Sequence, residues 1–383
     1  MPSLNDLEQL GNQRSDKKAK ATPEAWRPRL EVDEKGGFFV STPQANPVGD
    51  VVDLLSEFDL NPDEWTVTGV RRSKWQRWDE EWLHSYRVNV VPRKAHTAID
   101  PGQLEDDIIS WRPTKTAKPT KGDRAFVVTV GDTQWGKDAG DGSEGTVQRV
   151  MSAMESAAYR HRELKDRGIG TIVLPQMGDC IEGVVSQGGR ITGRLDLALT
   201  SQIRLGRRVL FECVKRMAPL TDRLIIPVVP GNHDESHRQV LTNPVDSFQV
   251  DIVSSVLDMC AQNPDLQHVE ARYPEADNTT LAVKVADTLL GLAHGHQARD
   301  LIKWWEGQAL GDTPVGSADI LITGHYHHLR VQNIGSRLWI QIPSLDGGSP
   351  WFKDRRGYDS PAGVVSLVVG ADYDPRRDLA VLT

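Results

Sequence analysis

The chain has 383 residues, with 45 Lys and Arg against 53 Asp and Glu and a formal net charge of −8. This length fits one large domain and a smaller one, and no apolar run reaches the roughly 20 residues that span a bilayer. The acidic balance argues against a protein that coats nucleic acid without specificity, but it allows a local basic patch.

Compartment is indicated by the N-terminal segment and the cysteines. The first 20 residues lack the apolar stretch of a secretory signal peptide. The three cysteines, Cys180, Cys213 and Cys260, are odd in number and far apart, so they fit neither a disulfide framework nor a paired thiolate metal site. We therefore expect a reduced, cytoplasmic protein without membrane contact.

The first third of the chain is expected to hold a small α+β domain. Residues 1–30 are polar and without periodicity, which is typical of a disordered arm. Within residues 31–111, an apolar stripe at 50–58 predicts a helix, and alternation at 65–70 and 86–91 predicts strands. Residues 112–123 carry two prolines and little to bury, so they predict a linker.

Residues 124–383 predict a second, α/β domain in which short apolar runs alternate with longer helical patterns. Such alternation is typical of a largely parallel sheet with crossover helices. The expected strands are 125–132, 171–179, 224–234, 281–287, 288–296, 318–325 and 337–344, and the expected helices are 144–167, 194–217 and 298–310.

Polar side chains that can bind a metal follow several of these strands. Eight of the eleven histidines lie between residues 233 and 328. Asp132, Asp179, Asn232, His294 and His325 each come where an apolar run ends, which is where open α/β sheets collect their sites. Oxygen and nitrogen ligands without thiolates favour Mn, Fe, Zn or Mg over a structural cysteine-type zinc site.

The same segments carry a family resemblance. The motifs Asp132-Thr-Gln134, Gly178-Asp179, Gly231-Asn232-His233-Asp234, His294-Gly-His296 and Gly324-His325-Tyr-His327 resemble the five ordered motifs of the calcineurin-like metallophosphoesterase superfamily. The similarity covers roughly residues 124–345. It implies a four-layer α/β/β/α sandwich that holds two divalent metal ions.

The resemblance also implies a ligand set. It places Asp132, Gln134, Asp179 and His327 on the first metal, and Asp179, Asn232, His294 and His325 on the second, with Asp179 bridging. Gln134 departs from the family, which usually has histidine there. A neutral amide oxygen is a weaker donor than imidazole, so this position favours Mn or Mg, with Fe or Zn as alternatives. The other interpretation of Gln134 is that it lies near the site without binding metal.

His233 is implied to be the catalytic histidine that does not bind metal. Two metals would neutralise the phosphoryl oxygens and generate a bridging hydroxide as nucleophile, while His233 supplies a proton to the leaving oxygen. Asp234 either orients His233 or caps the turn. Arg190, His296 and Arg355 are weaker candidates for substrate contact, since surface arginines and core-facing histidines are common without such a role.

The expected function is hydrolysis of phosphodiester bonds, with nucleic acid as substrate. The chain resembles the DNA-repair nuclease branch, which is exonuclease-like, and bacteriophage phosphoesterases, which would act in the host cytoplasm. Trp65, Trp75, Trp78 and Trp82, interleaved with arginines, suit single-stranded nucleic acid but equally suit a domain core. The alternatives are a phosphatase or cyclic phosphodiesterase acting on a small nucleotide, or a non-catalytic scaffold. A homodimer or a separate ATPase partner is compatible with this interpretation.

Overall fold

The computed structural model describes two compact units, Met1–Ala95 and His96–Thr383. The described residues are 27–33, 36–48, 51–62, 64–77, 80–92, 101–113, 119–185, 195–237, 243–348 and 360–383. The disordered arm expected at 1–30 lies mostly outside them, as does the middle of the expected linker. Each unit is described by itself.

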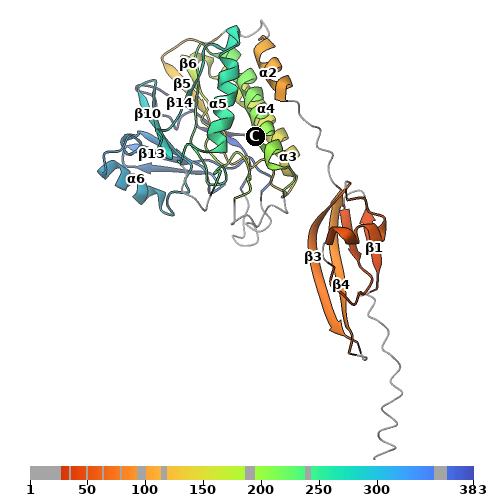
Figure 1. The fold of residues 1–383 in the computed structure, drawn as a ribbon. Coiled ribbons are helices and arrows are strands. Elements are labelled where there is room, and N and C mark those ends of the chain that lie inside the picture. The colour runs from red at the N-terminus through yellow and green to blue at the C-terminus, as the bar shows by residue number, and fades with distance from the viewer. Residues whose placement is uncertain are drawn as a thin grey trace, which may run out of the picture. The chain divides into compact units, whose positions relative to one another are not determined.

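The described residues of the first unit form an antiparallel sheet and two short 3-10 helices. Its strands are β1 (Arg29–Asp33), β2 (Gly36–Val40), β3 (Trp65–Gln76) and β4 (Trp82–Pro92), in the order β1-β2-β4-β3. The hairpin β3–β4 is much longer than the two strands expected from alternation (Figure 1). The expected helix at 50–58 is instead η2 (Val51–Leu54) and η3 (Ser56–Phe58), and Leu54 and Leu55 belong to the same core as Phe39 and Val88.

The larger unit is mixed α/β and contains a six-stranded sheet. Its strands are β5 (Arg124–Val128), β6 (Ile169–Val173), β7 (Leu224–Pro227), β8 (Val269–Arg272), β14 (Val364–Val369) and β15 (Ala380–Leu382). Their order is β15-β14-β5-β6-β7-β8. The four strands β5 to β8 are parallel, and β14 pairs antiparallel with both neighbours. The carboxyl ends of β5, β6 and β7 therefore share one edge of the sheet.

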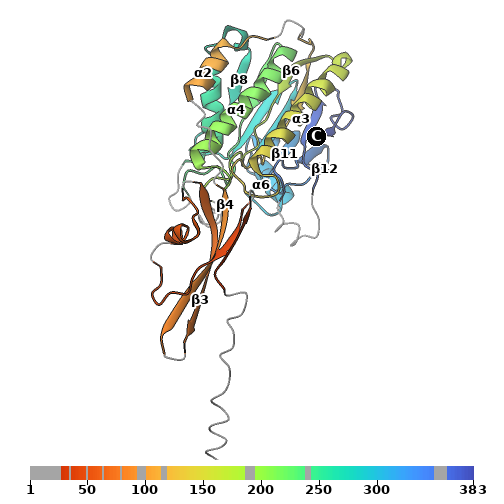
Figure 2. The same ribbon diagram turned by 90° about the vertical axis from the view of Figure 1, so that its right-hand side faces the viewer.

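Helices cover one face of this sheet. They are α2 (Pro101–Ser110), α3 (Gly142–Glu163), α4 (Leu199–Met217) and α5 (Phe248–Cys260), and the short helices η4 (Lys165–Arg167), η7 (Ala218–Leu220) and η8 (Pro264–Leu266) follow α3, α4 and α5. Phe126 and Val128 of β5 point into this helical core. Figure 2 shows α3 and α4 side by side across the sheet.

A five-stranded sheet packs on the other face. Its strands are β9 (Thr280–Val285), β10 (Thr288–Ala293), β11 (Ile320–Thr323), β12 (Arg330–Ile334) and β13 (Arg337–Gln341), in the order β12-β13-β11-β10-β9. Alternate residues of β5, Ala125 and Val127, meet Leu290 and Ile322 of this sheet in a second core. Since side chains alternate along a strand, β5 joins both cores.

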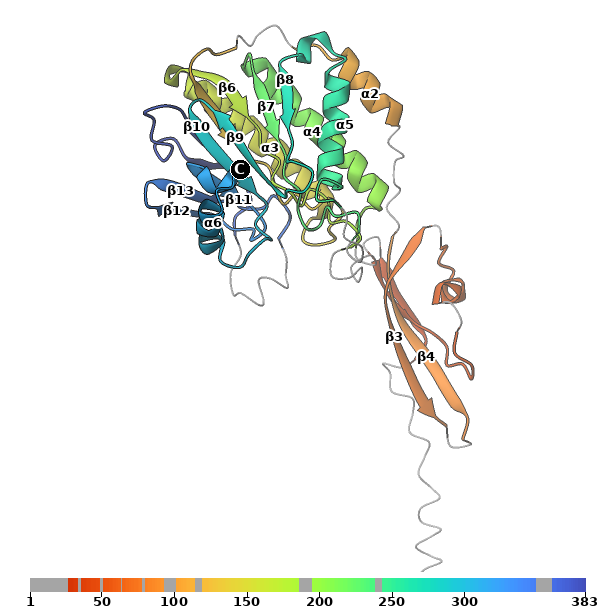
Figure 3. The ribbon, with the colours of Figure 1, turned by 60° about the vertical axis from the view of Figure 1, so that its left-hand side comes forward.

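The outer face of the five-stranded sheet is covered by α6 (Leu301–Leu310) and η9 (Val315–Ser317) (Figure 3). Leu321 and Trp339 project to this side and pack on Trp305. The strands β10, β11 and β13 are parallel, so the loops after β10 and β11 leave the same edge.

The unit boundary differs from the one expected from composition. We placed residues 31–111 in the first domain, but Leu104 and Ile108 of α2 are buried in the helical core of the second unit. Apolar residues three or four apart on a short helix do not show which core they join. No helix of the described segments is long and apolar enough to cross a membrane.

Candidate metal centre

The loops after β5, β6 and β7 are joined through their backbones. The Asp132 N–H donates to the Gly178 carbonyl (3.0 Å), and the Gln134 N–H donates to the Asp179 carbonyl (3.0 Å). The loop after β7 is attached by the N–H of His233, which donates to Asp179 Oδ1 (2.8 Å). The first three of the motif segments are therefore adjacent in space.

Several of these residues have an unusual backbone conformation. Their backbone φ angles lie between 43° and 70°, in the left-handed region that residues other than glycine seldom adopt. The residues concerned are Asp132, Gln134, Asp179, His325 and His327. Such conformations cost free energy and are held in place only by the surrounding structure. Their concentration at the strand ends marks this edge as a candidate functional site.

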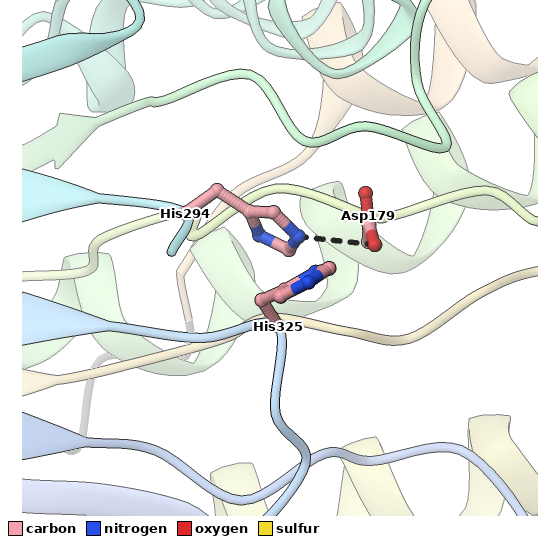
Figure 4. A group of neighbouring side chains, drawn as sticks. All are labelled: Asp179, His294 and His325. Carbon is pink, nitrogen blue, oxygen red and sulfur yellow. Dashed lines mark ion pairs between the residues drawn. The ribbon is translucent and has the colours of Figure 1, made fainter. Parts of the chain in front are cut away.

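Asp179, His294 and His325 form a compact group of possible metal ligands (Figure 4). One donor atom from each lies within 4.8 Å of the others, and among the described His, Cys, Asp and Glu residues this is the group of three that meets this criterion. Asp179 and His294 are buried, with His294 Nε2 3.0 Å from Asp179 Oδ2. The group combines strand ends from both sheets.

The surroundings of His294 show that the group suits a cation. Its Nδ1 donates to the Met177 carbonyl (2.8 Å), so the second nitrogen, Nε2, faces the carboxylate. This buried Nε2 has the Asp179 carboxylate as its polar neighbour, with Oδ2 3.0 Å away. Burial opposes protonation, but Asp179 and Asp132 raise the pKa of His294 to about 10. The position therefore favours positive charge, and a divalent metal with carboxylate and imidazole ligands fits it.

His325 is ready to act as a neutral ligand. Burial and the neighbouring His294 together lower the pKa of its imidazole to about 4, so the ring stays uncharged near neutral pH. The backbone N–H of His325 donates to both carboxylate oxygens of Asp132 (3.2 and 3.1 Å). This contact joins the five-stranded sheet to the loop after β5.

Asp132 and His327 face each other beside this group. His327 Nε2 lies 3.2 Å from Asp132 Oδ1, and its Nδ1 lies 3.6 Å from Asp346 Oδ2. Burial opposes protonation of His327, but Asp132 and Asp346 outweigh it and raise the pKa of the imidazole.

Gln134, expected as a ligand of the first metal, is buried and has a neighbour that sequence reasoning missed. Its Oε1 accepts a hydrogen bond from Lys137 Nζ (2.8 Å), and the same ammonium pairs with Asp346. Burial would raise the pKa of Asp346, but His327 and Lys137 lower it to about 2. Asp346 is 209 residues from Lys137, so no local spacing could have joined them.

His233 lies at the edge of the group, with 17% of its side chain exposed. Its Nδ1 donates to the Glu182 carbonyl (3.2 Å) and lies 3.4 Å from Glu182 Oε2, while Nε2 is 3.9 Å from Asp179 Oδ2. Burial lowers the pKa of His233, but Asp179 and Glu182 outweigh it and raise the pKa to about 9. Glu182 therefore supports this ring.

Asp234 is fully buried and holds the backbone of the Asp179 loop. It accepts hydrogen bonds from the N–H groups of Asp179 (2.6 Å), Gly231 (3.1 Å) and Ile181 (3.2 Å), and its Oδ1 is 3.3 Å from the Cys180 thiol. Of the two roles considered for Asp234, these contacts favour bracing the turn over orienting His233.

The remaining candidate residues differ in where they lie relative to the group of Asp179, His294 and His325. Asn232 is half-buried and lies between Gly231 and His233 in the loop that Asp234 and Asp179 hold. The His296 ring is 5.4 Å from that of His294 and 6.3 Å from that of His325, between ring centres, so it borders the group. Arg190 and Arg355 lie outside the described residues.

Comparison with known proteins gives weak structural similarity. No protein-family model matches the chain, and no curated protein matches it. Similar solved structures include zinc-complexed Vps29 from Entamoeba histolytica (15% identity, covering 64% of this chain and 87% of that chain, TM-score 0.30). Others are a predicted phosphoesterase from Streptococcus pneumoniae (14%, 67% and 87%, 0.29) and an archaeal phosphodiesterase (13%, 67% and 99%, 0.30). Similarity at this level assigns no activity to the chain.

Proposed function

We propose that this chain is a metal-dependent phosphodiesterase of the calcineurin-like metallophosphoesterase type. The observation that carries the proposal is the meeting of Asp179, His294 and His325 at the ends of strands from two sheets, with His233 beside them. The sequence of layers, from the helices through both sheets to α6, is the arrangement expected of a four-layer sandwich.

Two divalent cations would be held by the residues that the motifs indicate. Asp179, Asn232, His294 and His325 would hold one, and Asp132, Gln134, Asp179 and His327 the other, with Mn favoured. When bound, such cations neutralise phosphoryl oxygens and make water a nucleophile near neutral pH. Asp179 would be shared, since its carboxylate lies 3.0 Å from His294 Nε2 and its carbonyl accepts the Gln134 N–H.

His233 would act on the leaving oxygen. Its Nδ1 proton is engaged by Glu182, which fixes the ring, and the second nitrogen, Nε2, is the atom that would hold and deliver a proton. Asp179 and Glu182 favour the protonated ring. Asp234 would contribute indirectly, because it holds the loop that carries Asp179 and His233.

The substrate proposed is a nucleic acid, with a small nucleotide as the alternative. On the hairpin β3–β4, the Lys74 ammonium lies 4.2 Å from the ring centre of Trp82, whose side chain is 47% exposed. Exposed aromatic rings next to cations are typical of surfaces that bind single strands. This feature supports a polymeric substrate over a small one.

The test compares diester and monoester hydrolysis in wild-type protein and a His233→Ala variant. We expect Mn-dependent hydrolysis of bis-p-nitrophenyl phosphate and of labelled DNA, with much slower hydrolysis of p-nitrophenyl phosphate. His233→Ala should lower the diester rate about 100-fold or more while the bound metal stays the same, because the ring donates a proton without binding metal. Metal content is measured by mass spectrometry.

A matched histidine gives the control. His268 Nε2 donates to the Ala218 carbonyl (3.0 Å), away from the metal centre, so the His268→Ala variant should keep its activity. Full activity in His233→Ala would refute its role. Monoester hydrolysis alone would favour the nucleotide phosphatase, and no hydrolysis by metal-loaded protein would favour the scaffold.

A further inference from the structure

Lys137 places a positive charge at one side of the candidate metal centre. Its ammonium donates to Gln134 Oε1 (2.8 Å) and pairs with Asp346 Oδ2. The lysine side chain is 19% exposed and that of Asp346 only 1%. The pair is therefore largely shielded from water, and neither charge is much weakened by solvent.

The two carboxylate oxygens of Asp346 have different partners, and one of them is left to pair with Lys137. Its Oδ1 accepts hydrogen bonds from the Ser344 hydroxyl (2.9 Å) and the Gly348 N–H (3.1 Å). Its Oδ2 faces Lys137 and lies 3.6 Å from His327 Nδ1. Lys137 and Asp346 thus contact two residues, Gln134 and His327, that are expected to bind the first metal.

The two proposed metal positions therefore differ in the charge that lies beside them. Within the described residues, the ion-pair partners of Asp179 are His294 and His233, not a lysine or an arginine. At the other position, the oxygen of Gln134 already accepts a hydrogen bond from the Lys137 ammonium, and that oxygen is a neutral metal ligand. A cation there would meet the positive charge of Lys137 at close range, offset by Asp346.

We infer that Lys137 and Asp346 are positioning residues that set the affinity of the Asp132–Gln134–His327 position for its metal, and that Lys137 makes this position the weaker of the two. This inference rests on the proposed function. The protein would then bind one divalent ion tightly at Asp179, His294 and His325, and a second ion only at higher concentration.

Replacing Lys137 and replacing Asp346 should change the affinity for Mn²⁺ in opposite directions. Replacing Lys137 by methionine removes the cation and leaves the Asp346 carboxylate to attract a metal, so the weaker position should bind Mn²⁺ on the order of tenfold more tightly. Replacing Asp346 by asparagine leaves the ammonium uncompensated, so the same position should bind at least tenfold more weakly. The double variant should return towards wild type.

The experiment is a titration of metal-free protein with Mn²⁺, in which free Mn²⁺ is measured by electron paramagnetic resonance. Wild type, Lys137→Met, Asp346→Asn and the double variant are compared. Lys137→Arg keeps the charge and should retain two unequal affinities. Lys284→Met removes an exposed lysine of β9, 71% exposed, and should match wild type. If Lys137→Met does not fold, Lys137→Gln carries the same prediction.

Tighter binding at the weaker position in Lys137→Met, with the tight position unchanged, supports the inference. Equal affinities in wild type, or an unchanged or weaker second binding step in Lys137→Met, would overturn it. In these cases tight binding of one Mn²⁺ would leave the proposed metal centre intact. Absence of any Mn²⁺ binding by wild type would instead overturn the proposed function and the inference with it.

Discussion

At the scale of single residues, the candidate centre depends on buried carboxylates with different tasks. Asp179 faces two imidazoles, which lower its pKa against the effect of burial. At Asp234, burial and the charge of Asp179 outweigh the favourable effects of its hydrogen bonds and of His294 and raise the pKa to about 6. One carboxylate is thus arranged to bind a cation and the other to hold backbone N–H groups.

Replacing Asp234 by asparagine should destabilise the protein. An amide has one acceptor oxygen in place of two, and its NH₂ group would face backbone donors, so buried N–H groups of Asp179, Ile181 or Gly231 lose their partner. We expect the free energy of unfolding to fall by about 2–4 kcal/mol. Urea denaturation in EDTA measures this without the contribution of metal.

Asp222→Asn is the control for this comparison, because Asp222 is exposed and should change stability by less than about 0.5 kcal/mol. Equal stability of the two variants would contradict the bracing role of Asp234.

At the scale of elements, the junction between β7 and its loop is too close to Asp179 to accept a side chain. A Cβ on Gly231 would lie 2.1 Å from Asp179 Oδ1 and 2.2 Å from its backbone N. Gly231→Ala should therefore displace Asp179, weaken Mn²⁺ binding at least tenfold and lower the melting temperature. Metal titration and thermal denaturation measure the two effects.

Gly307 offers a matched glycine. A Cβ at this position of α6 would meet nothing within 4 Å, and alanine is the better helix former by about 1 kcal/mol. Gly307→Ala should keep its metal affinity and unfold at the same or a higher temperature. Unchanged metal binding in Gly231→Ala would show that the close approach at this junction does not position Asp179.

Elements with a strong local pattern could be predicted from the sequence. The apolar runs that precede Asp132, Asp179 and Asn232 are strands β5, β6 and β7, and the strands that precede His294 and His325 are β10 and β11. We did not predict the strands β1, β2, β8, β12, β14 and β15 or the helices α2 and α5. The partner of β14 is β5, more than 200 residues away, so its place in the sheet depends on contacts that no local period reveals.

The candidate centre, too, could be predicted only in part from local sequence patterns. The motif segments identify the residues that meet at the strand ends, because each follows its strand directly. Lys137 and Asp346 lie outside those motifs and become neighbours only through the fold. Sequence patterns also leave open what Asp234 contacts, and the backbone hydrogen bonds decide between the alternatives.

At the scale of the whole molecule, the candidate centre joins two sheets that share a core. Asp132 and Asp179 follow strands of the six-stranded sheet, while His294 and His325 follow strands of the other. A metal held by residues from both sheets would bind the folded state alone and stabilise the entire unit.

The most direct test of the central claim is the rate of bis-p-nitrophenyl phosphate hydrolysis before EDTA treatment, after it and after Mn²⁺ is returned. We predict that the rate falls to background in EDTA and recovers with Mn²⁺, and that the melting temperature falls and recovers in parallel. A rate that survives complete removal of metal, or no hydrolysis with Mn²⁺ bound, would contradict the assignment of this site as a metal-dependent phosphodiesterase.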